Sequence, residues 1–364
     1  RRSSPPARAM SPQGLWTGGS GAPNWDLQYA AWFGSKCMWA AGAVGGVYGG
    51  VLALLYAFQR NIIFPRPPVA APPTARGGRL VKGAGGEVAV YYPARAGQNT
   101  VVFWHGNGDQ IGHVAAHLGR LFADHADIGF YGIEYPGYGV APGAPSEGAI
   151  LRASEALLAR LVRPPPGGLG VDPESVVLFG QSIGCAPALT MATRGHGRRL
   201  ILLSPFASLQ DMALAVFPPL RILGTALPFF LHDTFDNRAK ARLVRVPSLV
   251  VHGLQDEIVP FPQGEEVASL VPGAEFMPLD GVGHNDALTT EVLTRVTKFV
   301  LEHRPQTNPG GAGRGGSVRH RAAPAPPGRG EESATTSAEE CKDASGDGGS
   351  TEGGGQAPTH DKTE

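Results

Sequence analysis

Ser182 stands between two glycines in the stretch Gly180-Gln181-Ser182-Ile183-Gly184, where a serine could act as a nucleophile. Apolar, β-forming residues precede this stretch and small, helix-compatible residues follow it, so the sequence predicts a strand, a sharp turn and a helix. A turn of the G-x-S-x-G type exposes the serine hydroxyl at the end of the strand. A side chain at either glycine would collide with the neighbouring strand or helix, because the turn is so tight. Ser182 is therefore the predicted nucleophile.

A serine hydroxyl needs a base that takes its proton, and the base needs a third group that fixes its tautomer. Two residues that suit these roles follow Ser182 in the chain, each just after an apolar run. Asp256 follows the run at 248–253, and His284 follows the run at 275–280. The sequence predicts that Asp256 orients His284 and that His284 is the base.

Other residues could take these two roles, and the sequence leaves them open. Glu257 and Asp280 are alternatives for the acid, and the chain holds 11 histidines. His284 is preferred because it follows the last predicted strand in a glycine-flanked loop, whereas His252 lies inside a predicted strand.

The oxyanion of an acyl-transfer intermediate needs preorganised N–H donors, each of which contributes roughly 2.7–4 kcal/mol. One predicted donor is the backbone N–H of Ile183, directly after the nucleophile. The other is the backbone N–H of Asn107, in the small-residue loop 103–112. The alternative is that 105–108 is an ordinary turn. This loop lacks the lysine and the spacing of a P-loop, so phosphate binding is not predicted.

Short apolar runs alternate with helical patterns between residues 86 and 304, which predicts an α/β domain with a mostly parallel central sheet flanked by helices. Residues 206–237, rich in Leu, Phe and Pro, interrupt this alternation and predict a lid over the strand ends. The predicted strands are 87–92, 100–105, 128–135, 175–180, 200–204, 248–253 and 275–280. The predicted helices are 111–126, 146–162 and 289–303.

An uncharged apolar segment at 37–59 precedes this domain. A helix of this length, at about 1.5 Å per residue, can cross roughly 30 Å of hydrocarbon, so a single-pass transmembrane anchor is predicted. A cleaved signal peptide and an apolar helix packed on the soluble domain are the alternatives. An anchor fits better than a signal peptide, because a polar segment at 1–36 comes first and the apolar core is too long.

Two rows of glycines lie four residues apart within the apolar segment, which permits close approach of two helices and a homodimer. These rows are Gly42, Gly46 and Gly50, and Gly45 and Gly49. Positive residues favour the cytoplasmic side of an endomembrane or plasma membrane. Lys36 stands alone before the segment and several arginines follow it, so the sequence favours a cytoplasmic catalytic domain.

Composition narrows the functional classes further. Lys plus Arg and Asp plus Glu both number 31 among the 364 residues, so no net charge attracts nucleic acid, and no nucleic-acid partner is predicted. The three cysteines, Cys37, Cys185 and Cys341, fit neither a disulfide framework nor a metal site, and neither a cofactor nor a metal is predicted.

A Pro-rich connector at 60–85 follows the predicted anchor. Residues 305–364 have almost no large apolar side chains and predict a disordered tail.

Several motifs, taken together, resemble the α/β-hydrolase superfamily. They occur in the superfamily's order and are LLYAFQRNIIFPRPP, FWHGNGDQIGH, IEYPGYGVAPGAPSEGA, FGQSIGCAPA, DTFDNRAKARLVRVPSLVVHGLQDEIVPF and GVGHND. Within the superfamily the chain is most similar to the bud-emergence-type membrane-anchored hydrolases and to their relatives, the α/β-hydrolase-domain protein depalmitoylases. Those relatives carry a cysteine-rich N-terminus, whereas this chain has Cys37 and an apolar segment.

The resemblance implies a serine hydrolase with Ser182 as nucleophile, Asp256 as acid, His284 as base, and backbone donors at Asn107 and Ile183. The expected substrate is an acyl ester or thioester of a lipid or an acylated protein. Two alternatives stay open. One is a peptidase or amidase with the same triad, and the other is a membrane-anchored scaffold without turnover.

Overall fold

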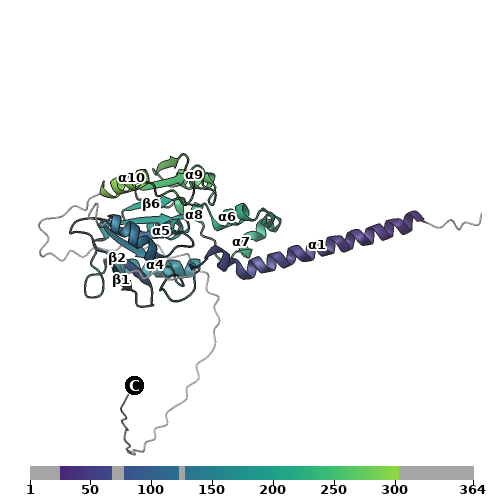
Figure 1. Cartoon of the computed structure of the whole chain (residues 1–364), viewed down its shortest axis with the longest axis horizontal. Coiled ribbons are helices and arrows are strands. Elements are labelled where there is room, and N and C mark those ends of the chain that lie inside the picture. Colours follow the sequence, from purple (N-terminus) through teal and green to yellow (C-terminus); the bar gives the residue numbers. More distant parts are fainter. Residues whose placement is uncertain (1–24, 68–77, 123–127, 303–364) are drawn as a thin grey trace, which may run out of the picture. The chain divides into compact units, whose positions relative to one another are not determined.

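The computed structural model of this protein describes residues 25–67, 78–122 and 128–302 (Figure 1). Parts of the predicted segments lie outside the described residues. They are residues 1–24 of the polar segment, 68–77 of the connector, 123–126 of the helix predicted at 111–126, residue 303 of the helix predicted at 289–303, and the whole tail at 305–364. The fold below is therefore the fold of the anchor-like helix and the α/β domain.

An eight-stranded sheet forms the centre of the domain, with the strand order β1-β2-β4-β3-β5-β6-β7-β8. β1 and β2 pair antiparallel, as do β2 and β4, and every other pairing is parallel. The strands are β1 (Arg79–Lys82), β2 (Val88–Tyr92), β3 (Thr100–Trp104), β4 (Gly129–Ile133), β5 (Val176–Gln181), β6 (Arg199–Leu203), β7 (Ser248–Gly253) and β8 (Glu275–Leu279). The predicted mostly parallel sheet is confirmed.

β1 is the strand that the sequence did not predict. It lies within the segment 60–85, which was expected to be connector alone. The strand is only four residues long and half exposed, with Val81 as its one buried residue, so it gives little apolar periodicity to detect. It pairs with β2 at the edge of the sheet.

Helices cover both faces of the sheet. Successive side chains of a strand point to opposite faces, so apolar strands give the sheet two apolar faces to bury. α4, α5, α8 and α9 pack on one face, and α2, η1 and α10 pack on the other. The helical segments are α2 (Ile111–Val114), η1 (Ala115–Gly119), α4 (Glu147–Val162), η2 (Pro173–Ser175), η3 (Ser182–Gly184), α5 (Cys185–Thr193), α6 (Leu209–Val216), η4 (Pro218–Ala226), α7 (Leu227–Phe230), α8 (Asn237–Ala241), α9 (Phe261–Leu270) and α10 (Thr290–Leu301).

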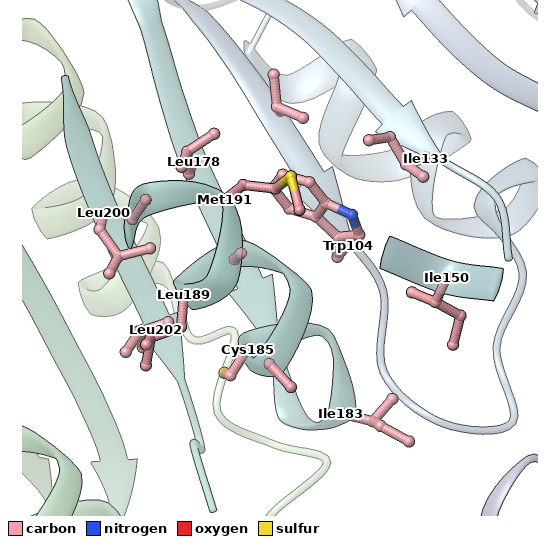
Figure 2. Close-up of a cluster of buried hydrophobic side chains, with 14 of the residues drawn as sticks. Trp104, Ile133, Ile150, Leu178, Ile183, Cys185, Leu189, Met191, Leu200 and Leu202 are labelled. Atoms are coloured by element: carbon pink, nitrogen blue, oxygen red, sulfur yellow. The ribbon is translucent and has the colours of Figure 1, made fainter. Parts of the chain in front are cut away.

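The core on the α5 face holds the middle of the sheet against two helices (Figure 2). Trp104 and Leu178 from neighbouring strands lie beside Met191 of α5 and Ile150 of α4, and none of these side chains is more than 1% exposed. The indole N–H of Trp104 donates to Ser154 Oγ of α4 at 2.8 Å. This hydrogen bond satisfies a polar group that would otherwise be buried without a partner.

Two of the predicted helices begin at residues whose side chains cap them. Ser146 accepts from the Ala149 N–H at the start of α4, and Thr289 accepts from the Val292 N–H at the start of α10. Each bond satisfies an N–H that has no partner within its helix. The third predicted helix, 111–126, is α2 followed by a single π turn, η1, and its last residues lie outside the described part of the chain.

The segment predicted as a lid forms α6, η4 and α7, which together are called the cap below. The cap lies between β6 and β7 in the sequence. Its surface carries three large apolar side chains that are at least 73% exposed, Val216, Ile222 and Phe229.

α1 (Trp25–Ile63) is a single helix of 39 residues, longer than the predicted segment at 37–59. Its stretch Tyr29–Ile63 is long and apolar enough to cross a membrane, with a mean hydropathy of 1.6. Most of its side chains are exposed, which no core helix of a soluble domain would show. A β-carbon on any of the five glycines in its two rows would meet nothing within 4 Å.

Ser154→Ala should destabilise the domain by about 1–3 kcal/mol, because it leaves the buried Trp104 indole N–H without an acceptor. Denaturant unfolding of the full chain in detergent measures this change. Ser269→Ala is the matched control, since the Ser269 hydroxyl also donates to a helix carbonyl but is exposed. The control should stay within about 0.5 kcal/mol of the parent, and equal effects of the two substitutions would contradict the argument.

Candidate active site

Ser182 lies at a sharp turn between β5 and α5, with a backbone φ of 52°. L-residues rarely adopt a positive φ, so the turn holds the serine in a strained conformation. The glycines on either side let the turn pack closely. A β-carbon on Gly180 would lie 2.3 Å from the Gly184 carbonyl oxygen, and one on Gly184 would lie 2.2 Å from the Trp104 carbonyl oxygen. The collision predicted for a side chain at either position therefore has an identified partner.

A chain of hydrogen bonds joins the three predicted side chains. His284 Nε2 lies 3.0 Å from Ser182 Oγ, and His284 Nδ1 lies 2.7 Å from Asp256 Oδ2. All three residues are at least 91% buried. Because a carboxylate can only accept, Nδ1 of His284 carries the proton and Nε2 accepts from the serine hydroxyl. The structure thus brings together residues that are 28 and 102 positions apart.

Asp256 is held by more donors than the sequence indicated. Its Oδ1 accepts from the backbone N–H groups of Ile258 and Val259, at 3.0 and 2.7 Å. Its Oδ2 lies 3.2 Å from Nε2 of His252 as well as facing His284. Burial acts to raise the pKa of Asp256, but hydrogen bonds from both imidazoles and from the loop N–H outweigh it. They hold the pKa well below the usual range of an aspartate.

His252 is the residue at this site that the sequence analysis set aside. It is fully buried, and its Nε2 also donates to the Val259 carbonyl at 3.0 Å. Its Nδ1 has no hydrogen-bond partner among the described residues and lies against Gly264, where a β-carbon would come within 1.9 Å. The available signal was spacing, because His252 and Asp256 are four residues apart at the end of one strand.

The two alternative acids occupy other positions. Asp280 is exposed and accepts from the Gln255 side chain and the Gly281 N–H. Glu257 accepts from the backbone N–H of His284 at 3.2 Å, so it contacts the loop of the histidine and not its imidazole. Of the three acids, Asp256 is the one placed to orient the ring.

The loop after β3 lies beside the serine, as the oxyanion prediction requires. Asn107 and Ile183 line the same cavity as Ser182. Ile183 lies in the first turn after Gln181, where backbone N–H groups have no partner within the helix. The role of both N–H groups stays a prediction.

A buried polar pair supports this loop, and the sequence analysis did not identify it. His105 Nε2 lies 2.9 Å from Glu134 Oε1, and both residues are at most 2% exposed. Glu134 Oε2 accepts from the Ile111 N–H, and Tyr135 donates from its hydroxyl to the His105 carbonyl at 2.6 Å. The signal was topological: His105 and Glu134 each directly follow one of two adjacent parallel strands, β3 and β4.

Cys185 is the nearest thiol to the turn in sequence, three residues after Ser182. It is fully buried, and its thiol donates to the carbonyls of Gly180 and Leu203. Burial raises the pKa of this thiol well above its ordinary value, although the backbone hydrogen bonds oppose the shift. Cys185 therefore stays a neutral, inaccessible thiol and is not a candidate nucleophile.

Ser182 opens onto a cavity of about 280 Å³ whose walls are almost entirely apolar. The cap supplies one side and the end of α1 supplies another. The lining residues are Leu55, Gln59, Ile62, Ile63, Asn107, Ser182, Ile183, Phe206, Leu209, Met212, Ala213, Val216, Phe217, Leu220, Phe230, Leu231, Ile258 and Val259. The described residues contain no cluster of three or more His, Cys, Asp or Glu side chains that could hold a metal ion.

Solved structures share this architecture. A thermophilic esterase from the Planctomycetes species Thermogutta terrifontis aligns with a TM-score of 0.50 at 18% identity, covering 65% of this chain and 95% of that one. Its butyrate-bound form aligns with the same TM-score and identity over 62% and 94% of the two chains. The chain therefore has the α/β-hydrolase fold. At this identity the likeness shows the fold and nothing finer.

Two relatives of similar sequence are α/β-hydrolase domain-containing proteins. The human α/β-hydrolase domain-containing protein 17C is 32% identical over 220 residues, which cover 59% of this chain and 61% of that protein. The Caenorhabditis elegans α/β-hydrolase domain-containing protein aho-3 is 32% identical over 203 residues, covering 55% and 57%. The chain therefore spans about three fifths of the length of the relatives it matches. No protein-family model matches the chain.

The low pKa of Asp256 gives a testable pH dependence. Because the folded pKa lies below the unfolded value of about 3.9, the unfolded chain binds more protons in mild acid. The contribution of the carboxylate to stability is present in full above about pH 5 and is lost as the pH falls. Asp256→Asn should thus show a shallower loss of unfolding free energy between about pH 5 and pH 3 than the parent. Equal slopes in denaturant titrations would contradict the argument.

Proposed function

We propose that this chain is a membrane-anchored serine hydrolase that cleaves acyl esters or thioesters, as the sequence predicted. One observation carries the proposal. The hydrogen-bonded chain of Ser182, His284 and Asp256 ends at the wall of an apolar cavity. A nucleophile next to such a cavity can attack a carbonyl carbon while the acyl chain of the substrate lies against apolar side chains.

The geometry supports a two-step reaction. Ser182 Oγ attacks the carbonyl carbon while His284 Nε2 takes its proton, and the developing oxyanion accepts from the backbone N–H groups of Ile183 and Asn107. His284 then gives its proton to the leaving alcohol or thiol. In the second step, a water molecule gives a proton to His284 and attacks the carbonyl carbon of the acyl-enzyme. The bond to Ser182 Oγ breaks, the serine regains its proton from His284, and the free acid leaves. Asp256 holds the imidazole tautomer and stabilises the imidazolium throughout.

The cavity supports an acyl group of limited length. Its volume of about 280 Å³ lies near the lower end of ordinary ligand pockets, which hold about 300–1,000 Å³. The walls hold few polar groups, which favours an acyl chain over a peptide as the bound group. No observation in the structure specifically favours the peptidase or the scaffold alternative.

The proposed membrane attachment rests on α1, whose apolar stretch is long enough to span a bilayer. The large exposed apolar side chains of the cap are consistent with a position close to the same membrane. A cytoplasmic catalytic domain and a homodimer through the glycine rows remain predictions from the sequence.

Ser182→Ala and His284→Ala should each abolish labelling of the full chain by a fluorophosphonate probe and lower ester turnover by about 10³-fold or more. A p-nitrophenyl ester series, matched thioesters and a matched anilide provide the turnover assay. Ser204→Ala is the control, because Ser204 is also buried, with a backbone φ of 51°, at the end of a parallel strand. A folded parent that neither labels nor turns over any acyl substrate would overturn the proposal, and a preference for the anilide would favour the amidase.

Extraction of membranes tests the anchor separately. The full chain should remain in the membrane pellet after an alkaline carbonate wash, because a spanning helix is released by detergent and not by high pH or salt. Release by carbonate alone would contradict a spanning α1.

A further inference from the structure

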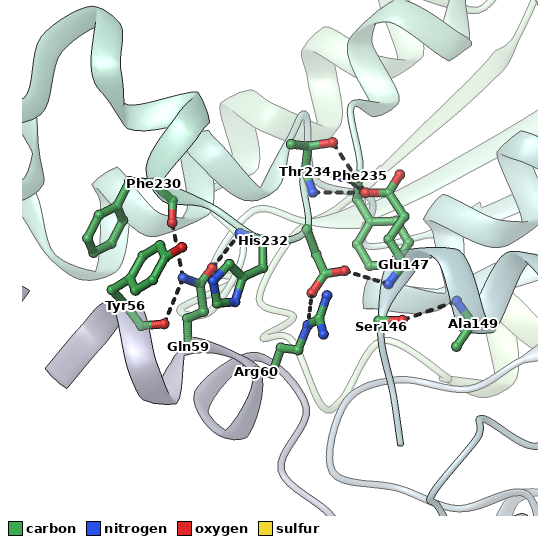
Figure 3. Close-up of polar contacts among 11 residues, drawn as sticks. Tyr56, Gln59, Arg60, Ser146, Glu147, Ala149, Phe230, His232, Thr234 and Phe235 are labelled. Atoms are coloured by element: carbon green, nitrogen blue, oxygen red, sulfur yellow. Dashed lines mark hydrogen bonds and ion pairs between the residues drawn. The ribbon is translucent and has the colours of Figure 1, made fainter. Parts of the chain in front are cut away.

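The last turns of α1 are joined to the cap by polar contacts (Figure 3). The Gln59 side chain donates to the Phe230 carbonyl at 3.1 Å and accepts from the His232 N–H at 2.7 Å. Gln59 is only 5% exposed, although the neighbouring positions of the helix are exposed. Tyr48, three turns earlier, donates to the Pro219 carbonyl at 2.7 Å. The cap is therefore fixed against the helix at two levels.

An ion pair extends this connection into the α/β domain. Arg60 Nε lies 2.9 Å from Asp233 Oδ2, and Asp233 Oδ1 accepts from the Glu147 N–H at the start of α4. Glu147 in turn accepts from the backbone N–H groups of Thr234 and Phe235 (Figure 3). Asp233 is 97% buried, so removal of its partner would leave a buried charge without compensation. These contacts hold α1, the end of the cap and α4 in one arrangement.

The same end of α1 contacts the loop beside the serine. The Asn107 side chain donates to the Ile63 carbonyl at 2.7 Å, and its own oxygen accepts from the Gly108 N–H and the Tyr138 hydroxyl. The carbonyls of a last helical turn have no partner within the helix, so the Ile63 carbonyl is free to accept this bond. The helix end thereby fixes the side chain of the residue whose N–H is the predicted oxyanion donor.

One face of the helix end is a wall of the cavity. Leu55, Gln59, Ile62 and Ile63 line the cavity, and their spacing of three and four residues places them on one side of a helix. Leu54 is not among the lining residues and is 60% exposed. Without α1 the cavity would be open to its surroundings along this side.

We propose that the end of α1 is part of the substrate site: Leu55, Ile62 and Ile63 form the wall that determines which acyl chains the cavity accepts. This inference rests on the proposed hydrolase function and deepens it, because it gives the membrane-anchor helix a role in specificity. The acyl chain of the substrate would lie against this wall, because the wall is apolar and Ser182 is the one nucleophilic group among the described residues that line the cavity.

Substitutions on the two faces of one helical turn test the wall. Leu55→Trp fills the cavity from the helix side, so kcat/KM for an octanoyl ester should fall about tenfold or more relative to an acetyl ester. Leu55→Ala enlarges the cavity and should shift the preference toward longer chains. Leu54→Trp adds the same bulk on the adjacent face and should leave the chain-length profile unchanged. Fluorophosphonate labelling of each full-length variant in detergent shows whether it is folded with a competent serine.

A binding measurement separates this inference from the hydrolase proposal. In the Ser182→Ala background no turnover is needed, and Leu55→Trp should weaken binding of a fluorescent octanoate analogue about tenfold, whereas Leu54→Trp should not. An unchanged chain-length profile and unchanged binding in both Leu55 variants would overturn the inference, even if the parent is an active hydrolase. If the Leu55 variants alter binding but the parent hydrolyses no substrate, the inference that α1 lines the binding site holds and the proposed hydrolase function is overturned.

Discussion

The whole site depends on how closely the turn at Ser182 packs against β3. The Gly184 α-carbon lies so near the Trp104 carbonyl that no side chain fits between them. This contact holds the serine beyond the end of its strand and beside the loop that contains Asn107. Because the packing leaves no room to relax, the strained backbone of the serine persists. A looser turn would leave the hydroxyl without a fixed direction toward His284.

Two buried carboxylates near this turn, those of Glu134 and Asp256, each accept hydrogen bonds from several donors. Glu134 accepts hydrogen bonds from His105 and from the start of α2, and Asp256 accepts from two histidines and from its own loop. A buried carboxylate is costly unless donors surround it, so these networks disfavour other loop conformations. His252 thus belongs to the support of the site, although it does not touch the serine.

The helix α1, the proposed membrane anchor, also contacts the elements around the candidate active site. Arg60 and Gln59 fix the cap, and the helix end holds Asn107. A single helix therefore contacts both the cap and the loop beside Ser182. Movement of α1 relative to the domain would alter the cavity and the loop that contains Asn107 together.

The sequence by itself determined seven of the eight strands, the capped helices α4 and α10, and the order of Ser182, Asp256 and His284, because each depends on local patterns. Apolar runs specify buried parallel strands, and a serine between two glycines after such a run specifies the turn. The apolar stretch of α1 was also detectable, although its ends were not, because the helix continues past Lys36 and Arg60, where the uncharged stretch ends.

Only the tertiary structure decided which distant groups meet. β1 gave too little periodicity to be recognised, and it forms because β2 offers an unpaired edge. The pairing of His105 with Glu134 depends on which strands are neighbours, and that order is not written in either motif. The contact of Ile63 with Asn107 depends on the docking of α1, which brings together residues 44 positions apart. Local patterns specify elements, whereas the packing of the elements decides which polar groups share the site.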